Sequence, residues 1–405
     1  MTNNKEKKVL NVPNLRFPEF EGEWMESTIG KQFELYSGNT PSRLNKDYFK
    51  GEINWISSGE LKDHYVYSSK EKISQEASLN LKMLPVGTFV IAIYGLEAEG
   101  VRGTGSIIKE KSTISQACMA FSSIGEVENE FLYSWYKKHG NIIGLKYAQG
   151  TKQQNLSYDI LERFKIAYPC KQEQEKLNKF ISLLDERIAT QNKIIEDLKK
   201  LKSAISKHLF TRKDLLETTI CLSEIATLRN GYAFQSSKYN ALGKWKILTI
   251  TNVSGERHIN DEDCNCIINL PDDIQDHQVL KEGDILISLT GNVGRVSLCK
   301  DGDYLLNQRV GLLQLAKNVN QEFLYQILSS QKFENSMIAC GQGAAQMNIG
   351  KGDVESYVLP YSSNVNNILL VAKILHSYDE YIINEQRKLT LLTMQKQYFL
   401  AQMFI

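Results

Sequence analysis

The chain contains two long segments in which apolar residues recur every three or four positions. The first runs from Lys171 to Arg212 without a glycine or a proline. Alternating steps of four and three are typical of a helix that buries one narrow seam against another helix. The predicted seam of this first segment comprises Leu177, Ile181, Leu184, Ile188, Gln191, Ile195, Leu198, Lys202, Ile205 and Leu209.

The second segment carries the same seam 194 residues later. Its two polar interruptions recur as well, because Gln191 matches Glu385 and Lys202 matches Lys396. We therefore expect two similar helices that pair through these faces, the alternative being two unrelated surface helices. The second predicted seam comprises Val371, Leu375, Tyr378, Ile382, Glu385, Leu389, Leu392, Lys396, Phe399 and Met403.

The polar seam positions suggest a register for the pair. In an antiparallel arrangement with a pseudo-twofold axis, Lys202 would face Glu385 and Gln191 would face Lys396. Polar residues within a seam can fix register at some cost in stability. A helix of roughly 38 residues is on the order of 57 Å long, so such a pair would hold two bodies a fixed distance apart.

The segments that precede the two helices also repeat each other. Glu130-Phe-Leu-Tyr133 recurs letter for letter as Glu322-Phe-Leu-Tyr325, and Gln116 matches Gln308. The offset stays between 192 and 196 residues along the whole half, which indicates duplication of an entire domain. Further matches pair Ser37-Gly38 with Asn230-Gly231, Leu84 to Gly95 with Leu280 to Gly291, and Gly150 to Asn155 with Gly343 to Asn348.

Each copy has a strand-rich part with a short helix before its long helix. Apolar runs bounded by turn residues predict the strands. In the first copy we expect strands at Trp55-Ile56, Thr88 to Tyr94 and Ile114 to Phe121, and a helix at Phe131 to Lys138. In the second we expect Ile247 to Val253, Asp284 to Leu289, Val310 to Leu315 and, as the helix, Phe323 to Ser329.

The predicted fold class is α+β, with two mixed α/β domains in tandem repeat. Two long helices would join them as an antiparallel coiled coil with pseudo-twofold symmetry. The expected boundaries are a flexible N-terminal extension at 1–22, a first domain at 23–168, a central spacer helix at 169–212, a second domain at 213–360 and a C-terminal spacer helix at 361–405.

Composition fits a soluble, cytoplasmic protein of several domains. The chain has 405 residues, a formal net charge of +1, and 42% hydrophobic and 23% charged residues, which are ordinary values. Its seven cysteines form no disulfide framework, and Cys264-Asn-Cys266 lacks the partners of a zinc site. No apolar run is long enough to span a membrane, and the charged opening is unlike a signal peptide.

Catalytic motifs are not found along the sequence. Gly343 to Lys351 superficially suggests a phosphate loop, but Gly352 stands where Ser or Thr would bind magnesium. The six histidines are scattered without the spacing of a metal site or a triad. A binding protein is favoured, and the alternatives are a coiled-coil scaffold with two protein-binding heads and an enzyme with an unrecognised site.

Short motifs accompany the repeat, namely Trp24, Ile29-Gly30, Ser37 to Pro41, Gly150 to Leu156, Phe164 to Pro169, Asn230 to Phe234 and Gly343 to Ile349. The second copy departs from the first, because Pro360-Tyr-Ser-Ser lacks the Glu173-Gln174 pair. Each motif alone is short, but the duplication with paired long helices is specific. Together, the repeat and its motifs resemble the specificity subunit of type I DNA restriction-modification enzymes over nearly the whole chain.

The resemblance implies a non-catalytic chain that binds double-stranded DNA. Each globular domain would be a target recognition domain that reads one half of an interrupted sequence, and the helices would set the unread spacer. The implied partners are two methyltransferase subunits, which bring S-adenosylmethionine for adenine methylation, and restriction subunits, which bring ATP, magnesium and cleavage. This chain itself would hold no cofactor and no metal.

Base reading requires amide and guanidinium groups at the groove edge, with hydroxyl and backbone N–H groups on phosphates. A rival role for Arg309 is a buried ion pair, and the glycine loops at 150 and 343 could be structural turns. The candidates in the first domain are Ser37, Asn39, Thr40, Ser42, Arg43, Ser57, Ser58, Arg102, Thr104, Thr151, Lys152, Gln153, Gln154 and Asn155. Those in the second are Tyr232, Gln235, Thr251, Asn252, Asn292, Arg295, Arg309, Gln342, Gln346 and Asn348.

Overall fold

The computed structural model describes residues 11–98, 100–150, 154–341 and 347–405. The chain divides into two compact units. Unit 1 comprises residues 1–192 and 388–405, and unit 2 comprises residues 193–387. Each unit therefore contains one globular domain together with a part of each long helix.

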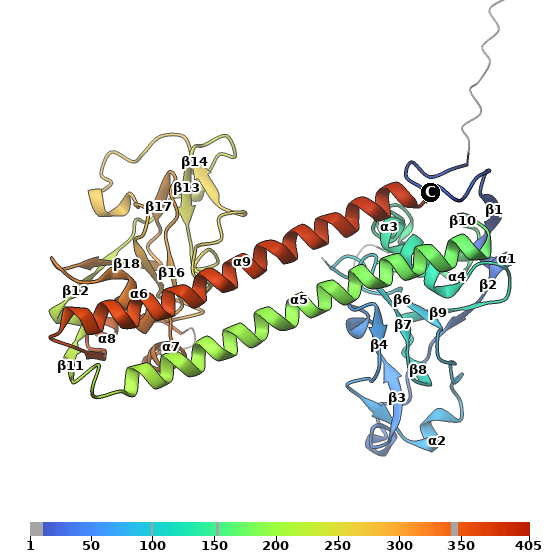
Figure 1. Ribbon diagram of the computed structural model, residues 1–405, viewed down its shortest axis with the longest axis horizontal. Helices are drawn as coiled ribbons and strands as arrows, with labels where there is room; N and C mark the ends of the chain where they lie inside the picture. Colours follow the sequence, from blue (N-terminus) through green and yellow to red (C-terminus); the bar gives the residue numbers. More distant parts are fainter. Residues whose placement is uncertain (1–10, 99, 151–153, 342–346) are drawn as a thin grey trace, which may run out of the picture. The chain divides into compact units, whose positions relative to one another are not determined.

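The first repeat supplies the elements of unit 1 up to its long helix (Figure 1). Short 3-10 turns lie at Lys46–Phe49 and Ser58–Glu60. The other elements are β1 (Met25–Thr28), α1 (Ile29–Gln32), β2 (Phe33–Ser37), β3 (Ile53–Ile56), β4 (Tyr65–Val66), β5 (Lys72–Ile73), α2 (Gln75–Ser78), β6 (Phe89–Ala92), β7 (Gly105–Ile108), β8 (Ser112–Ile114), β9 (Cys118–Ser123), α3 (Asn129–Tyr147), α4 (Tyr158–Glu162), β10 (Lys165–Tyr168) and α5 (Lys171–Thr211).

The second repeat supplies a corresponding set of elements. Its 3-10 turns lie at Leu222–Glu224, Ser236–Lys238 and Asp276–Gln278. The other elements are β11 (Thr218–Cys221), β12 (Ala226–Asn230), β13 (Trp245–Leu248), β14 (Asn265–Ile267), β15 (Ile285–Ser288), β16 (Val296–Leu298), β17 (Tyr304–Leu306), β18 (Val310–Leu315), α6 (Gln321–Leu328), α7 (Gln331–Cys340), α8 (Lys351–Glu355), β19 (Val358–Tyr361) and α9 (Val365–Met403).

The sheets of the two units correspond, apart from the additional edge strand β4 in unit 1, and this correspondence confirms the tandem repeat. The larger sheet has strand order β2-β9-β6-β7-β4 in unit 1 and β12-β18-β15-β16 in unit 2. A smaller sheet is ordered β5-β3-β8 in unit 1 and β14-β13-β17 in unit 2, and in both cases its central strand pairs in parallel with the last. A third pairing, β1 with β10 and β11 with β19, brackets each domain.

Strand β6 shows why the central strands are apolar at every position. Phe89 and Ile91 pack into the core that the larger sheet shares with α3 and the long helices. Val90 and Ala92 point the other way, into the core beneath the smaller sheet. A strand buried on both faces loses the alternation of apolar and polar residues. In unit 2, β15 is likewise buried at every position.

Two sequence predictions about elements need correction. The expected strand at Ile114 to Phe121 is in fact β8 and β9, joined by a tight turn in which Cys118 N donates to Ser115 O. The expected helix at Phe131 to Lys138 extends to Tyr147 as α3. Gly140 lies within the added turns and permits close packing on Gly103, since a Cβ there would lie 2.8 Å from the Gly103 Cα.

The matching helix of the second repeat is divided into α6 and α7. The break falls at Ser329-Ser330, where the first repeat has Lys137-Lys138. Ser330 has extended backbone angles and its side chain accepts a hydrogen bond from Phe333 N, so it caps α7. A serine in this position favours a new helix start over continuation.

The described part of the N-terminal extension, for which the sequence predicts flexibility, contacts α5. Arg16 forms two hydrogen bonds with the carboxylate of Glu173, at 2.8 and 2.7 Å, and Glu173 is only 1% exposed. The ring of Phe17 meets Phe180 edge to face at 6.1 Å. Residues 11–22 are thus held on α5 by a buried carboxylate that would otherwise lack a counter-charge.

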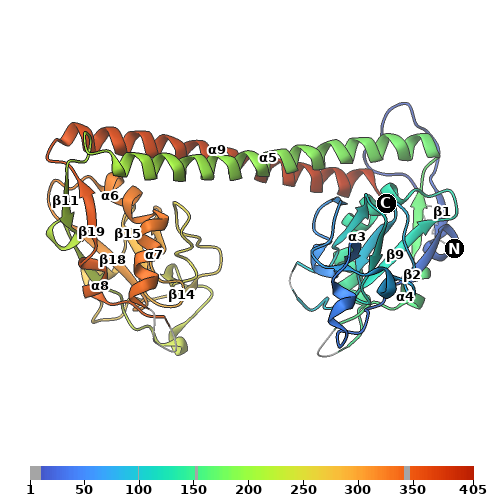
Figure 2. The ribbon, with the colours of Figure 1, turned by 90° about the horizontal axis from the view of Figure 1, so that it is seen from below.

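The long helices α5 and α9 lie antiparallel within each unit (Figures 1 and 2). In unit 1, Phe180 of α5 packs edge to face on Phe399 of α9, with centroids 4.9 Å apart. In unit 2, Lys202 Nζ of α5 lies 2.5 Å from the carboxylate of Asp379 of α9. None of the predicted seam residues is exposed.

The predicted register of the helix pair was wrong. Lys202 pairs with Asp379 rather than Glu385, and Lys396 pairs with Asp185 rather than Gln191. Each aspartate occupies the position directly after a seam residue, Leu184 or Tyr378. A lysine of the facing helix reaches this flanking position and forms an ion pair with the aspartate.

The end of each long helix completes the core of the unit that it enters. Leu400, Met403 and Phe404 are buried with Phe131 and Leu177 in unit 1. The rings of Phe404 and Phe131 lie 5.3 Å apart. In unit 2, Leu209 near the end of α5 is buried in the same core as Phe323.

We expect Phe404→Ala to lower the free energy of unfolding of unit 1 by about 3 to 5 kcal/mol, because it empties a fully buried aromatic site. Tyr398→Ala is the matched control, since Tyr398 lies on the same helix but is 57% exposed; its effect should be within about 0.5 kcal/mol. Urea unfolding of both variants measures the difference. Equal losses would show that the helix end contributes nothing to the core.

Candidate nucleic-acid interface

Four segments of unit 2 that are far apart in the sequence are tied together by backbone hydrogen bonds. Tyr232 N donates to Leu306 O, and Gln308 N donates to Tyr232 O. Leu289 N donates to Arg309 O, at 3.0 Å, so the end of β15 adjoins the turn before β18. Ile349 N in turn donates to Leu289 O, at 2.9 Å. The turn after β12, the turn before β18, the end of β15 and the loop before α8 therefore form one continuous surface.

Unit 1 builds the same surface from the matching segments. Gly38 N donates to Cys118 O and Asn39 N donates to Ile114 O, both at 3.1 Å. Ile93 N donates to Ala117 O, and Leu156 N donates to Ile93 O. We call these surfaces the loop faces. They comprise residues 37–40, 94–96, 115–117 and 154–155 in unit 1, and residues 230–232, 290–291, 307–309 and 347–348 in unit 2.

A glycine is required at the same point of both loop faces. A Cβ on Gly38 would lie 2.3 Å from Ser115 O, and one on Gly231 would lie 2.2 Å from Asn307 O. Neither backbone oxygen can move without disturbing the turn that it belongs to. The glycine thus recurs in the repeat because two chain segments approach each other closely at this point. The sequence match of Gly38 with Gly231 did not reveal this reason.

Asn155 and Asn348, which match across the repeat, are anchored in equivalent ways. Asn155 forms an isolated antiparallel β-bridge with Tyr94, and Asn348 forms one with Thr290. In unit 1 the carboxylate of Glu97 also accepts a hydrogen bond from Gln154 N, and this bond lowers the pKa of Glu97. The candidates Thr151, Lys152, Gln153, Gln342 and Gln346 lie outside the described residues.

The remaining candidates of the first domain separate into two groups. Ser37 and Asn39 are exposed on the loop face, with Thr40, Gln154 and Asn155 half-buried beside them. Ser58 is half-buried in a 3-10 turn and Ser42 is exposed beyond the face. The other candidates have partners inside the domain, and these are Arg43, Ser57, Arg102 and Thr104.

Those four side chains have identifiable structural roles. Arg43 forms two hydrogen bonds with Glu71, whose pKa it lowers, and its guanidinium lies 4.2 Å from the Phe49 ring centre. Ser57 Oγ donates to Glu60, Arg102 donates to Leu96 O and Thr104 Oγ1 donates to Val101 O. These bonds hold the four side chains against their own domain.

In the second domain, Tyr232, Arg309 and Asn348 lie on the loop face. Arg309 is exposed in the turn before β18, so the alternative of a buried ion pair inside a strand is wrong. The Tyr232 hydroxyl donates to Asp273 at 2.7 Å, a bond that raises the pKa of Tyr232. Asn292, which directly follows the loop-face residue Gly291, is exposed. Gln235 and Thr251 are exposed nearby, and Arg295 is half-buried, 3.5 Å from Glu334.

The prediction that Asn252 contacts DNA needs correction, because this residue is buried, with only 4% of its surface exposed. Its side-chain oxygen accepts from Thr249 N at 2.7 Å, and its nitrogen donates to Asn260 O at 2.8 Å. These bonds hold the turn after β13. A side chain whose donors and acceptors are satisfied inside the domain has none left for a base edge.

Two residues of the loop faces were missed as candidates. Gln116 and Gln308 occupy the central turn of each face and are exposed. The sequence carried the signal, since these two glutamines match across the repeat. A glutamine amide can both donate and accept, which suits the edge of an adenine.

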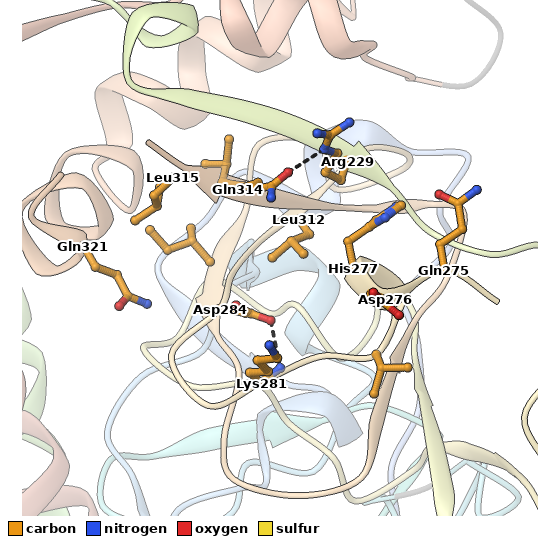
Figure 3. A pocket seen from close by; sticks show the side chains of 13 residues that line it. Arg229, Gln275, Asp276, His277, Lys281, Asp284, Leu312, Gln314, Leu315 and Gln321 are labelled. Carbon is orange, nitrogen blue, oxygen red and sulfur yellow. Dashed lines mark hydrogen bonds between the residues drawn. The ribbon is translucent and has the colours of Figure 1, made fainter. Parts of the chain in front are cut away.

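The cavity in Figure 3 lies beside the loop face of unit 2. It measures about 580 Å³ and lies against β12, β18 and β15. Arg229 Nε donates to Gln314, and His277 Nε2 lies 3.1 Å from Asn230 O. Its lining includes no serine or cysteine that His277 could activate. Asp284 accepts a hydrogen bond from Lys281 N at 2.8 Å.

The described residues contain no group of three or more His, Cys, Asp and Glu side chains that could hold a metal ion. No helix in the described ranges is both long enough and apolar enough to cross a membrane.

We expect Gly231→Ala to lower the free energy of unfolding by about 1 to 3 kcal/mol, because the added methyl would overlap Asn307 O. Gly352→Ala serves as the control. Its Cβ would have no heavy atom within 4 Å, and alanine suits the helix α8 in which it lies. Thermal unfolding of both variants gives the comparison, and a Gly231→Ala variant as stable as Gly352→Ala would contradict the close approach.

Comparison with known proteins identifies the family. The type I restriction modification DNA specificity domain matches residues 21–200 and again residues 217–394. The specificity subunit of the type I restriction enzyme MjaVIII from Methanocaldococcus jannaschii is 25% identical over 362 residues, which cover 82% of this chain and 80% of that protein. The MjaIX specificity subunit of the same organism is 29% identical over 196 residues, covering 46% of this chain and 44% of the relative.

Two solved structures share the fold. The S subunit of a type I restriction-modification system from M. genitalium matches with a TM-score of 0.59 and 17% identity, covering 97% of this chain and 99% of that chain. A chain from a structural study of complex assembly and conformational transition of the type I R-M system matches with a TM-score of 0.54 and 16% identity, covering 94% and 97%. With both matched regions spanning most of its length, the chain belongs to the family of type I restriction modification DNA specificity domains and carries two copies of that domain.

Proposed function

We propose that this chain is the DNA-reading subunit of a type I restriction-modification complex. Recognition domain 1 (residues 23–168) would read one half of an interrupted duplex target, and recognition domain 2 (residues 213–360) the other. The observation that carries the proposal is the loop face, which occurs twice with three equivalent backbone hydrogen bonds. A shared framework with different side chains is what reading two different half-sites requires.

The side chains of the two loop faces suit base edges. Unit 1 presents Asn39, Gln116 and Asn155, whereas unit 2 presents Gln308, Arg309 and Asn348. Amides pair with adenine and a guanidinium pairs with guanine in the major groove, where each base pair has a distinct pattern. The two faces would therefore recognise different bases, and the helices α5 and α9 would set the length of the unread spacer.

The chemistry would belong to partner subunits. Two methyltransferase subunits would bring S-adenosylmethionine for adenine methylation, and restriction subunits would bring ATP and magnesium for cleavage. Exposed apolar residues of α9 support such docking. In unit 1, Leu391, Met394 and Tyr398 are 65%, 60% and 57% exposed, and in unit 2 Tyr381 is 62% exposed. Clustered exposed apolar side chains mark surfaces that bind other proteins.

The same apolar surface is the observation that favours the second candidate, a non-catalytic scaffold with two protein-binding heads. The two candidates differ in their response to salt. A DNA-reading subunit binds one interrupted duplex, and its affinity falls steeply as salt is raised because phosphate contacts release counterions. A scaffold captures its partner without duplex and with little dependence on salt.

The direct test is methylome sequencing of a host that carries this chain with a methyltransferase subunit of its own complex. We expect methylated adenines in one bipartite motif with a fixed gap, and their loss when this chain is deleted. Exchange of residues 23–168 for the corresponding segment of a relative should then change one half-site and leave the other unchanged. A change in both half-sites, or in neither, would overturn the proposal that each recognition domain reads one half-site.

We expect Arg309→Ala to weaken binding to the bipartite duplex about fivefold or more, in line with the ~1 to 3 kcal/mol of a bidentate base contact. Lys317→Ala is the matched control. Lys317 is also exposed but lies beyond the opposite end of β18, away from the loop face. Its loss should change affinity less than about twofold. Fluorescence anisotropy with the duplex from the methylome experiment measures both, and equal effects would exclude Arg309 from the interface.

A further inference from the structure

In unit 1, four charged side chains from four separate elements meet where the recognition domain adjoins the long helices. His64 directly precedes β4, Glu130 lies in α3, Asp185 in α5 and Lys396 in α9. His64 Nε2 is 2.8 Å from Glu130. His64 Nδ1 lies 3.0 Å from Asp185, close enough for an ion pair although without the angle of a good hydrogen bond. Asp185 also pairs with Lys396.

Unit 2 contains the same arrangement with one exchange. Arg257 takes the place of His64 and forms two hydrogen bonds with Glu322, at 2.9 and 2.6 Å. It also lies 2.9 Å from Asp379, which pairs with Lys202 at 2.5 Å. The backbone confirms the equivalence, because Ile107 N donates to His64 O and Leu298 N donates to Arg257 O, both at 2.8 Å.

The two clusters also match across the sequence repeat. Glu130 and Glu322 belong to the identical Glu-Phe-Leu-Tyr motifs, and Asp379 follows Asp185 by the 194 residues that separate the two seams. The long helices exchange roles, since α5 gives the aspartate in unit 1 and the lysine in unit 2. We call these clusters the charge clamps, each consisting of one domain cation, one domain glutamate, one helix aspartate and one helix lysine.

Each clamp is largely shielded from water. The side chains of His64 and Arg257 are 5% and 10% exposed, and those of Asp185 and Asp379 are 15% and 8% exposed. His64 stacks on Tyr133 with ring centres 4.0 Å apart, and Arg257 lies 5.0 Å from the Tyr325 ring centre. A buried cation held by two carboxylates from different bodies fixes both the distance and the direction between them.

We propose that His64 and Arg257 are positioning residues, each of which fixes the angle of its recognition domain on the helices of its own unit and thereby the DNA gap that the chain accepts. This inference rests on the proposed function. Neither residue belongs to a loop face, so neither reads a base. Their effect reaches the DNA only through the orientation of the domain that they hold.

The clamps differ in how they respond to pH. Burial lowers the pKa of His64, but the carboxylates of Asp185 and Glu130 outweigh it and raise that pKa above its ordinary value. The charge of His64 is therefore present below neutral pH and is lost as the pH rises through the raised pKa. The guanidinium of Arg257 keeps its charge throughout, because Glu322 raises its pKa further despite burial.

Other groups facing His64 must be considered in any pH experiment. Tyr65 stacks on it from β4, and Tyr133 and Lys137 approach from α3. Lys109 lies 3.9 Å from Glu130, and Lys396 approaches from α9. Burial, with a contribution from Lys396, lowers the pKa of Lys137 to about 8, so this lysine titrates near the same range. A variant that lacks His64 but keeps Lys137 distinguishes the titration of the histidine from that of the lysine.

The test compares His64→Gln with His64→Arg, which copies the clamp of unit 2. The probes are duplexes with both half-sites found by methylome sequencing, at the native gap and at one base pair shorter or longer, and a duplex with the first half-site alone. We expect His64→Gln to reduce the preference for the native gap at least fivefold, with affinity for the single half-site unchanged within twofold. His64→Arg should keep the wild-type preference.

The pH profile of the unmodified chain provides a second measurement that does not depend on the stability of a variant. Between pH 6 and pH 8.5, the gap preference of the wild type should fall, whereas that of His64→Arg should stay level. A fall that persists in His64→Arg would assign the response to Lys137 and overturn the proposal. An unchanged preference in both His64→Gln and the wild-type pH series would also overturn it. A wild-type chain that binds no interrupted duplex would instead refute the proposed function.

Discussion

The exchange of helix ends between the two repeats is the constraint on which the rest of the structure depends. Neither recognition domain closes its core with its own repeat alone. Phe404, from the end of the second repeat, fills the core of unit 1 beside Phe131, and Leu209, from the end of the first repeat, fills that of unit 2. The apolar surface buried in this way is the main source of stability for such a contact. Because each end is locked into a core, the pairing of α5 with α9 within each unit has a defined direction and register.

Much of the architecture could be predicted because the signals are local or repeated. The bounds of α5 and α9 follow from the absence of glycine and proline, and the shared sheet topology follows from the matched motifs. The register of the helices could not be predicted in the same way. A heptad seam fits a partner equally well after a shift along the axis. The deciding contacts involve Asp185 and Asp379, which lie beside the seam and were not counted with it.

The candidate interface shows the same division between local and non-local information. The repeat placed Asn155 and Asn348 at equivalent loop ends, and the structure joins them to Tyr94 and Thr290 in the same manner. Sequence could not reveal that Arg43 is already bound to Glu71 or that Asn252 holds a buried turn, since both depend on residues brought close by folding. Residue type alone therefore overstates the number of side chains that are free to read DNA.

The shared core of unit 1 has a consequence for synthesis of the chain. Domains usually fold in the order in which they leave the ribosome. Here the core of recognition domain 1 includes Leu400, Met403 and Phe404, which are translated after recognition domain 2. Until they are made, Phe131 and Leu177 lack these apolar partners. Recognition domain 1 is thus completed only after recognition domain 2 has been translated, and a ribosome that stalls within α9 leaves its core incomplete.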